Sequence, residues 1–322
     1  MEAPPQIRQT LSEISSRTPA ALRIAVGIRL GSLPPSAAAG REDVARYAAS
    51  LARQLQPRAR RSDPPTGAAL RMSAASCYLP EHDEDAHFFH AVAGVIGVAD
   101  GVGGCRLEGL DAAAFSRGLM ASALSEVVAS SAAAPPPPPG GICPYALLEK
   151  AYQQTAASGT PAASTAVIVS LAGRALRWAY VGDSGFAVFR DGRILHRSQP
   201  QQSYFNCPFQ LSSDSEDSNK VSDAAVGEIA VEEGDVVVVA SDGLFDNVFD
   251  VMLEKIVQSG LALSFTPKNM ADIIASQAYT AARRTQDTPF SIAAREHGRN
   301  KTGGKKDDTT VVVAFIESRD IA

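Results

Sequence analysis

Cysteine is scarce in this sequence, with four residues among 322, and no two of them form a C-x-x-C pair. The four lie far apart, at Cys77, Cys105, Cys143 and Cys207. This scatter argues against a disulfide framework or a zinc site and favours a reducing, intracellular compartment. Long apolar runs are also missing, since none approaches the roughly 18 residues of a membrane-spanning helix. We therefore expect no membrane span.

Excess basic charge and the common nucleophile motifs are absent as well. The net charge is −5, which argues against nucleic acid as a partner. The chain has no G-x-S-x-G, no P-loop and no kinase catalytic loop, so none of these chemistries is indicated. Hydrophobic residues make up 45% of the chain, enough to build a core and too many for a wholly disordered chain.

Lysine is missing from the chain before Lys150, and arginine dominates the N-terminus. Residues 1–72 hold eleven arginines and five acidic residues, whereas the remaining residues carry a net charge of −11. An Arg-rich, acid-poor start is typical of an organelle transit peptide. We expect residues 1–67 to be a partly disordered extension that directs the chain to a chloroplast or mitochondrion, or else a basic tail of a cytoplasmic or nuclear protein. The folded domain is expected over residues 68–322.

Short apolar runs rich in β-branched residues cluster along the chain, and helical patterns lie between the clusters. Strands are predicted at 93–99, 165–171, 176–181, 186–190, 235–240 and 310–316. Helices are predicted at 111–128, 145–157, 249–259, 267–284 and 291–297. The short turns within 165–190 predict antiparallel hairpins, and the five prolines at 135–139 predict a loop. Clustered strands and paired helices favour an α+β fold.

Acidic residues gather at the ends of these runs. They stand in the sequences 82–85 (HDED), 98–101 (VADG), 181–185 (VGDSG), 240–243 (ASDG) and 306–309 (KDDT). A single Asp-Gly indicates only a turn, but carboxylates that converge repel one another unless a cation lies between them. Oxygen ligands select hard cations such as Mg²⁺ or Mn²⁺. A pair of such ions serves phosphate-ester hydrolysis.

In their order, these motifs resemble the metal-dependent Ser/Thr protein phosphatases of type 2C. The segments that carry the resemblance are 84–85, 97–104, 164–166, 182–185, 241–246 and 307–310, within residues 73–316. Residues 201–211 and 288–290 are similar to the T-cell-activation phosphatase subgroup, which has plant and organellar members. The resemblance implies a four-layer αββα sandwich of two mainly antiparallel sheets flanked by helices.

The resemblance also implies two Mg²⁺ or Mn²⁺ ions per chain and a set of residues around them. Asp100 is expected to bridge both ions and, with Asp242, to be essential for catalysis. Glu84 and the Gly101 carbonyl are expected to serve one ion, while Asp242 and Asp307 hold the other. The expected surrounding or third-metal positions are Asp85, Asp183, Asp246 and Asp308, and the resemblance leaves open which of Asp307 and Asp308 faces the metal.

Two residues depart from the pattern of the resembled family. Val102 stands where a histidine usually acts as the general acid, and Pro80 stands where an arginine often binds the substrate phosphate. His82, His87 and His90 are nearby candidates for a replacement acid. The basic segment 303–306 (GGKK) is interpreted as a flexible turn before a strand rather than as a phosphate site.

The leading hypothesis is therefore a monomeric phosphatase that acts on phosphoserine and phosphothreonine in proteins. Because the usual histidine and arginine are missing, a catalytically weak fold that binds phosphoproteins is an alternative. A metal phosphohydrolase of small molecules is a further alternative. The retained carboxylates argue against an inactive fold, because unpaired crowded acids destabilise a protein.

Overall fold

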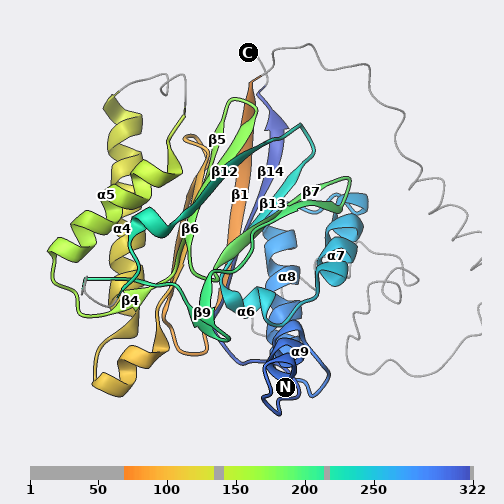
Figure 1. Ribbon diagram of the computed structural model, residues 1–322. Coiled ribbons are helices and arrows are strands. Elements are labelled where there is room, and N and C mark those ends of the chain that lie inside the picture. Colours follow the sequence, from red (N-terminus) through yellow and green to blue (C-terminus); the bar gives the residue numbers. More distant parts are fainter. Residues whose placement is uncertain (1–68, 134–140, 214–217, 320–322) are drawn as a thin grey trace, which may run out of the picture.

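Two five-stranded antiparallel sheets pack face to face, and helices cover both outer sides (Figure 1). The computed structural model describes residues 69–133, 141–213 and 218–319. The predictions for residues 1–67 and for the prolines at 135–139 lie outside the described residues. The architecture is the expected α+β sandwich of four layers.

Each sheet combines strands that are consecutive in the chain with strands that lie far apart in it. In order across the first sheet, the strands are β1 (Leu70–Leu79), β14 (Thr309–Ser318), β13 (Val236–Ala240), β7 (Gly185–Arg190) and β8 (Arg193–Arg197). Across the second they are β12 (Ala225–Ala230), β6 (Ala175–Val181), β5 (Ala166–Ala172), β3 (Val95–Asp100) and β2 (Asp85–His90). Two short ladders lie beside them: β9 (Gln202–Tyr204) pairs with β10 (Cys207–Pro208), and β4 (Ala163–Ser164) pairs with β11 (Leu211–Ser212).

The helices divide between the two outer faces. On the second sheet lie α4 (Ala112–Ala133) and α5 (Pro144–Ala157), and on the first lie α6 (Asp242–Phe245), α7 (Asp250–Ala262), α8 (Pro267–Ala282) and α9 (Pro289–Glu296). Short 3-10 turns are η1 (Gly103–Glu108) and η2 (Val221–Asp223). Helix α8 begins where the Thr266 hydroxyl accepts a hydrogen bond from the Asn269 N–H, with Pro267 following it, a typical N-terminal cap.

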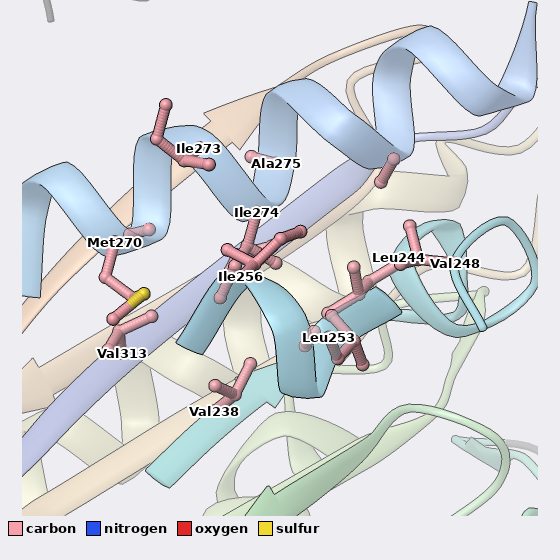
Figure 2. Close-up of a cluster of buried hydrophobic side chains, with 14 of the residues drawn as sticks. Val238, Leu244, Val248, Leu253, Ile256, Met270, Ile273, Ile274, Ala275 and Val313 are labelled. Atoms are coloured by element: carbon pink, nitrogen blue, oxygen red, sulfur yellow. The ribbon is translucent and has the colours of Figure 1, made fainter. Parts of the chain in front are cut away.

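The central strands are buried on both faces, which explains why they read as unbroken apolar runs. In β13, Val236 and Val238 face the helices α7 and α8, whereas Val237 and Val239 face the other sheet. This alternation follows from the two-residue period of a strand. Figure 2 shows the helix-side cluster, in which Val238 lies near Leu253, Ile256 and Met270.

The predicted elements are present with small shifts at their ends, except in one respect. The hairpin of β5 and β6 is confirmed by its antiparallel register. The prediction that β6 and β7 continue as a second hairpin is wrong, because the two strands belong to different sheets. The connection at residues 182–184 passes from one layer to the next and carries Gly182 with a φ of 101°, a conformation that glycine adopts without strain.

A membrane-spanning helix was not expected. Within the described ranges, no helix is long and apolar enough to cross a bilayer.

Candidate metal centre

Asp100 is the last residue of strand β3. Its main-chain N–H donates to the Thr165 hydroxyl at 3.2 Å, and its carbonyl accepts from Thr165 N at 2.9 Å. Gly101 follows, and its N–H donates to the Glu84 carbonyl at 3.1 Å. A Cβ on Gly101 would lie 2.3 Å from the Ala112 carbonyl oxygen, so only glycine fits this position.

Glu84 and Asp85 lie where the chain enters β2, beside Asp100. Asp85 is directly opposite Asp100 in the ladder between β2 and β3. Both Glu84 and Asp85 are buried, and Asp85 accepts a hydrogen bond from the Ser241 hydroxyl at 2.7 Å. This bond joins the second sheet to the residue that precedes Asp242.

The neighbours Asp307 and Asp308 have different surroundings. Asp307 lines the cavity described below. Asp308 points the other way: its carboxylate accepts hydrogen bonds from the main-chain N–H groups of residues 81–85, at distances between 2.5 and 3.3 Å. Although burial alone would raise it, these hydrogen bonds hold the pKa of Asp308 below its ordinary value. Asp308 therefore anchors the segment that carries Glu84.

Asp242 and Asp246 lie at the two ends of the short helix α6, which begins directly after β13. The Asp246 N–H donates to the Asp242 carbonyl at 2.8 Å, so one helical turn brings both carboxylates to the same side. Gly243 permits the close approach of the strand that follows Asp307. A Cβ there would lie 1.9 Å from the Asp308 carbonyl oxygen.

One cavity brings these segments together. All five predicted metal ligands line it, namely Glu84, Asp100, Gly101, Asp242 and Asp307. Asp183 also lines it, and its carboxylate accepts a hydrogen bond from the Gln202 amide at 3.0 Å. Asp85, Asp246 and Asp308 are not among the lining residues. Residues 206–208 of the β9–β10 hairpin also line the cavity.

The carboxylates in the cavity repel one another. Burial and the charges of Asp85 and Asp242 raise the pKa of Asp100 well above its ordinary value. Burial and the charge of Asp242 raise the pKa of Asp183 to about 7 and that of Asp307 to about 6. These raised pKa values mean that ionisation of the cluster destabilises the fold unless positive charge lies beside it.

Two basic side chains supply part of that charge, and the sequence had not indicated either. The Lys305 ammonium lies 2.5 Å from Asp242 Oδ2 and 2.9 Å from Asp246 Oδ2. The Arg106 Nε lies 2.9 Å from Glu84 Oε1. The interpretation of 303–306 as a mere basic turn is therefore incomplete, since Lys305 folds into the cavity. Its only signal in the sequence is its place two residues before Asp307.

The donor set fits hard divalent cations, since it consists of carboxylates and a backbone carbonyl. Asp242 Oδ1 is buried and has no hydrogen-bond partner among the residues that the structure describes, as expected of an oxygen that awaits a ligand. In the same part of the chain, no three His, Cys, Asp or Glu side chains are already arranged to hold an ion. The basic side chains instead balance the acids.

The three candidate acids differ in position. His82 lines the cavity. His87 is held in the sheet, with its Nε2 2.9 Å from the Ser76 hydroxyl, and burial lowers its pKa. His90 accepts a hydrogen bond from the Ala93 N–H at 3.1 Å in the turn after β2. Of the three, His82 alone reaches the cavity, where Val102 also lies.

The fold resembles solved phosphatases. The X-ray structure of the photosystem II phosphatase PBCP superposes with a TM-score of 0.67 and 31% identity, covering 77% of this chain and 100% of that one. The catalytic domain of the serine/threonine phosphatase PstP, in complex with two manganese ions, has a TM-score of 0.53 and 21% identity, covering 77% of this chain and 100% of that domain. The latter likeness concerns the fold alone.

Sequence relatives cover nearly the whole chain. Protein phosphatase 2C 24 of Oryza sativa subsp. japonica is 52% identical over 325 residues, which is 98% of this chain and 100% of the rice protein. Protein phosphatase 2C 23 of the same plant is 47% identical over 99% of this chain and 98% of its own length. The family model for protein phosphatase 2C matches residues 79–271. The chain thus belongs to the protein phosphatase 2C family of metal-dependent protein serine/threonine phosphatases.

Proposed function

We propose that this chain hydrolyses phosphoserine and phosphothreonine in proteins at the acidic cavity, with two Mg²⁺ or Mn²⁺ ions per chain. The observation that supports this most is the convergence of Glu84, Asp100, Asp242 and Asp307 on one cavity. They come from separate segments, and the stability of the fold gives no reason to bring so many acids together. The two manganese ions of the PstP catalytic domain agree with the proposed number.

The residues divide between the two proposed ions. Glu84, Asp100 and the Gly101 carbonyl would hold one ion, and Asp100, Asp242 and Asp307 would hold the other. When bound, such a pair of ions polarises the phosphoryl oxygens and lowers the pKa of a water molecule for attack on phosphorus. Asp308 and Ser241 hold Glu84 and Asp85 in place through the hydrogen bonds described above, and such outer contacts would orient the ligand Glu84.

Arg106 is suited to bind the substrate phosphate, the role that Pro80 cannot fill. Its side chain lines the cavity and remains 47% exposed while it pairs with Glu84. A planar guanidinium matches two phosphate oxygens at once. Arg106 comes from η1 and pairs with Glu84, whereas Lys305 pairs with Asp242. It would hold the phosphoryl group over the acidic floor.

His82 is suited to donate the proton that the leaving serine or threonine alkoxide requires. It lines the cavity, as does Val102, but the valine side chain has no ionisable proton to donate. Histidine is the commonest general acid in enzymes. We propose this role for His82 and a framework role for His87 and His90.

A direct assay separates the three hypotheses for this chain. Full-length protein is incubated with a phosphothreonine peptide, a phosphoserine peptide and p-nitrophenyl phosphate, with Mn²⁺ or with excess EDTA. We expect hydrolysis of both peptides only with the metal. Metal-dependent hydrolysis of the small ester alone would favour a small-molecule phosphohydrolase. Peptide binding without hydrolysis would favour a binding module.

The catalytic unit is proposed to act as a monomer. The arginine-rich segment 1–67 is proposed as an organellar targeting segment. The composition of that segment supports this proposal, as does the similarity to a photosystem II phosphatase. A fluorescent fusion of residues 1–72 is expected to enter a plastid or mitochondrion. A fusion that stays diffuse in the cytosol would contradict the proposal.

A further inference from the structure

The Lys305 ammonium is surrounded by three carboxylates from two segments. It lies 2.5 Å from Asp242 Oδ2, 2.9 Å from Asp246 Oδ2 and 3.2 Å from Asp307 Oδ2. The side chain is only 20% exposed. The ammonium therefore places a positive charge within the acidic cluster.

The main chain of Lys305 is fixed in place by a buried amide. The Asn247 Oδ1 accepts from the Lys305 N–H at 2.9 Å, and the Asn247 Nδ2 donates to the Lys305 carbonyl at 2.8 Å. Asn247 also donates from Nδ2 to the Gly243 carbonyl at 3.0 Å, in the helix that carries Asp242. This double clamp aims the lysine side chain into the cluster, whereas the next residue, Lys306, is exposed.

We propose that Lys305 is a resident cation that stabilises the metal-free chain and competes with the divalent ion for Asp242 and Asp307. It serves the side of the cluster where Asp246 lies, so no third ion is needed there. The part of this proposal that concerns divalent ions rests on the proposed function. The part that concerns the metal-free chain does not.

Two opposite consequences follow from this single charge. Without a metal, Lys305 offsets the repulsion among Asp242, Asp246 and Asp307, so its loss destabilises the fold. With a metal, the same ammonium is a like charge beside a dication and occupies the oxygen atoms that the ion needs, so its loss strengthens ion binding. A residue with a packing role alone would give the first effect without the second.

The test compares Lys305→Met with Lys306→Met in the full-length chain. Methionine keeps the length of the side chain and removes the charge, and the exposed neighbour controls for a lost lysine in general. In excess EDTA, we expect Lys305→Met to melt at least about 5 °C below Lys306→Met, as loss of the partner of a buried charge cluster implies. In a calorimetric Mn²⁺ titration, we expect its weaker site to bind at least about tenfold more tightly than in the wild type.

A second substitution keeps the test decisive if Lys305→Met does not fold without metal. Asp246→Asn removes one of the three carboxylates but is outside the proposed ligand set. In this background, Lys305→Met is expected to lower the melting temperature in EDTA by less than half as much as it does alone. If Lys305→Met alone does not fold without metal, the double variant is expected to fold. An undiminished loss would show that packing and not charge is at work, and would contradict the proposal.

Other results would also overturn it. An unchanged melting temperature in EDTA would show that Lys305 does not stabilise the metal-free chain. An unchanged or weaker Mn²⁺ affinity of Lys305→Met would show that it does not compete with the ion. If the wild-type chain bound no Mn²⁺ at all, the proposed function would fail, while the melting comparison would still test the stabilising role.

Discussion

The carboxylate of Asp308 accepts a hydrogen bond from the main-chain N–H of Glu84 at 2.5 Å. Four further N–H groups, of residues 81–83 and 85, point at the same carboxylate. The residue beside one proposed ligand, Asp307, therefore fixes the segment of another, across 224 residues of chain. This contact positions the segment that brings Glu84 to the cavity.

Replacing Asp308 by Asn tests this contact. Asparagine keeps the shape but loses the charge and presents an N–H₂ to N–H donors, so several main-chain groups lose their acceptor. We expect the free energy of unfolding in EDTA to fall by about 2–4 kcal/mol, since hydrogen bonds to a buried charge are the strong ones. Urea unfolding measures it. Asp83→Asn, whose carboxylate is 65% exposed, is the control and should change little.

The same residue predicts a pH effect at the acid end. Because the pKa of Asp308 is lowered in the fold, its contribution to stability is present above the unfolded value and is lost as the pH falls through the folded value. The difference in stability between wild type and Asp308→Asn should therefore shrink as the pH is lowered toward about 3. A difference that stays constant over this range would contradict the role of the charge.

Asp183 predicts the opposite dependence in the metal-free chain. Its pKa is raised to about 7 by burial and by Asp242, so the folded chain favours the protonated form and loses stability as the pH rises through 7. Asp183→Asn cannot ionise and still offers an oxygen to Gln202. In EDTA, its stability relative to wild type should therefore grow between pH 5 and pH 8. Thermal melting across this range measures the trend, and a flat difference would contradict it.

Arg106 and its control Arg117 allow a matched test of substrate binding. Both side chains are about half exposed, at 47% and 49%, and each pairs with an acidic residue. Arg106 lines the cavity, and Arg117 does not. We expect Arg106→Ala to lower kcat/KM for a phosphothreonine peptide by about 10–100-fold, chiefly through KM, as loss of a charged hydrogen-bonding pair implies. Arg117→Ala should stay near wild type, and equal effects would refute the assignment.

The sequence predicted the interior of both sheets but missed their edges. The central strands β13, β14, β5 and β6 are buried on both faces or nearly so, and they read as β-branched apolar runs. Within the two five-stranded sheets, the strands that were missed are the outer ones, β1, β2, β8 and β12. Their pattern is weaker because one side meets solvent, as the alternating exposure of β12 shows. Edge strands owe their place to a neighbour rather than to their own composition.

For the site, too, the sequence predicted what a local pattern marks and missed what depends on contacts between distant segments. The acidic residues at strand ends were predictable because turns with Asp-Gly stand out, and the cavity brings them together. The choice between Asp307 and Asp308 was not predictable, since it depends on which carboxylate meets the N–H groups of residues 81–85. The role of Lys305 depends on the Asn247 clamp across 58 residues, which no local pattern reveals.

Asp100→Asn tests the central claim most directly. Asparagine keeps the volume and one oxygen but removes the negative charge that the proposed ions share, so we expect kcat to fall at least ~10³-fold. Its melting temperature in EDTA should hold or rise, because carboxylate repulsion is relieved, while the increase on adding Mn²⁺ should shrink. If Asp100 were only a turn residue before Gly101, asparagine would replace it well. Turnover near wild type with an unchanged Mn²⁺-dependent melting shift would contradict the dinuclear site.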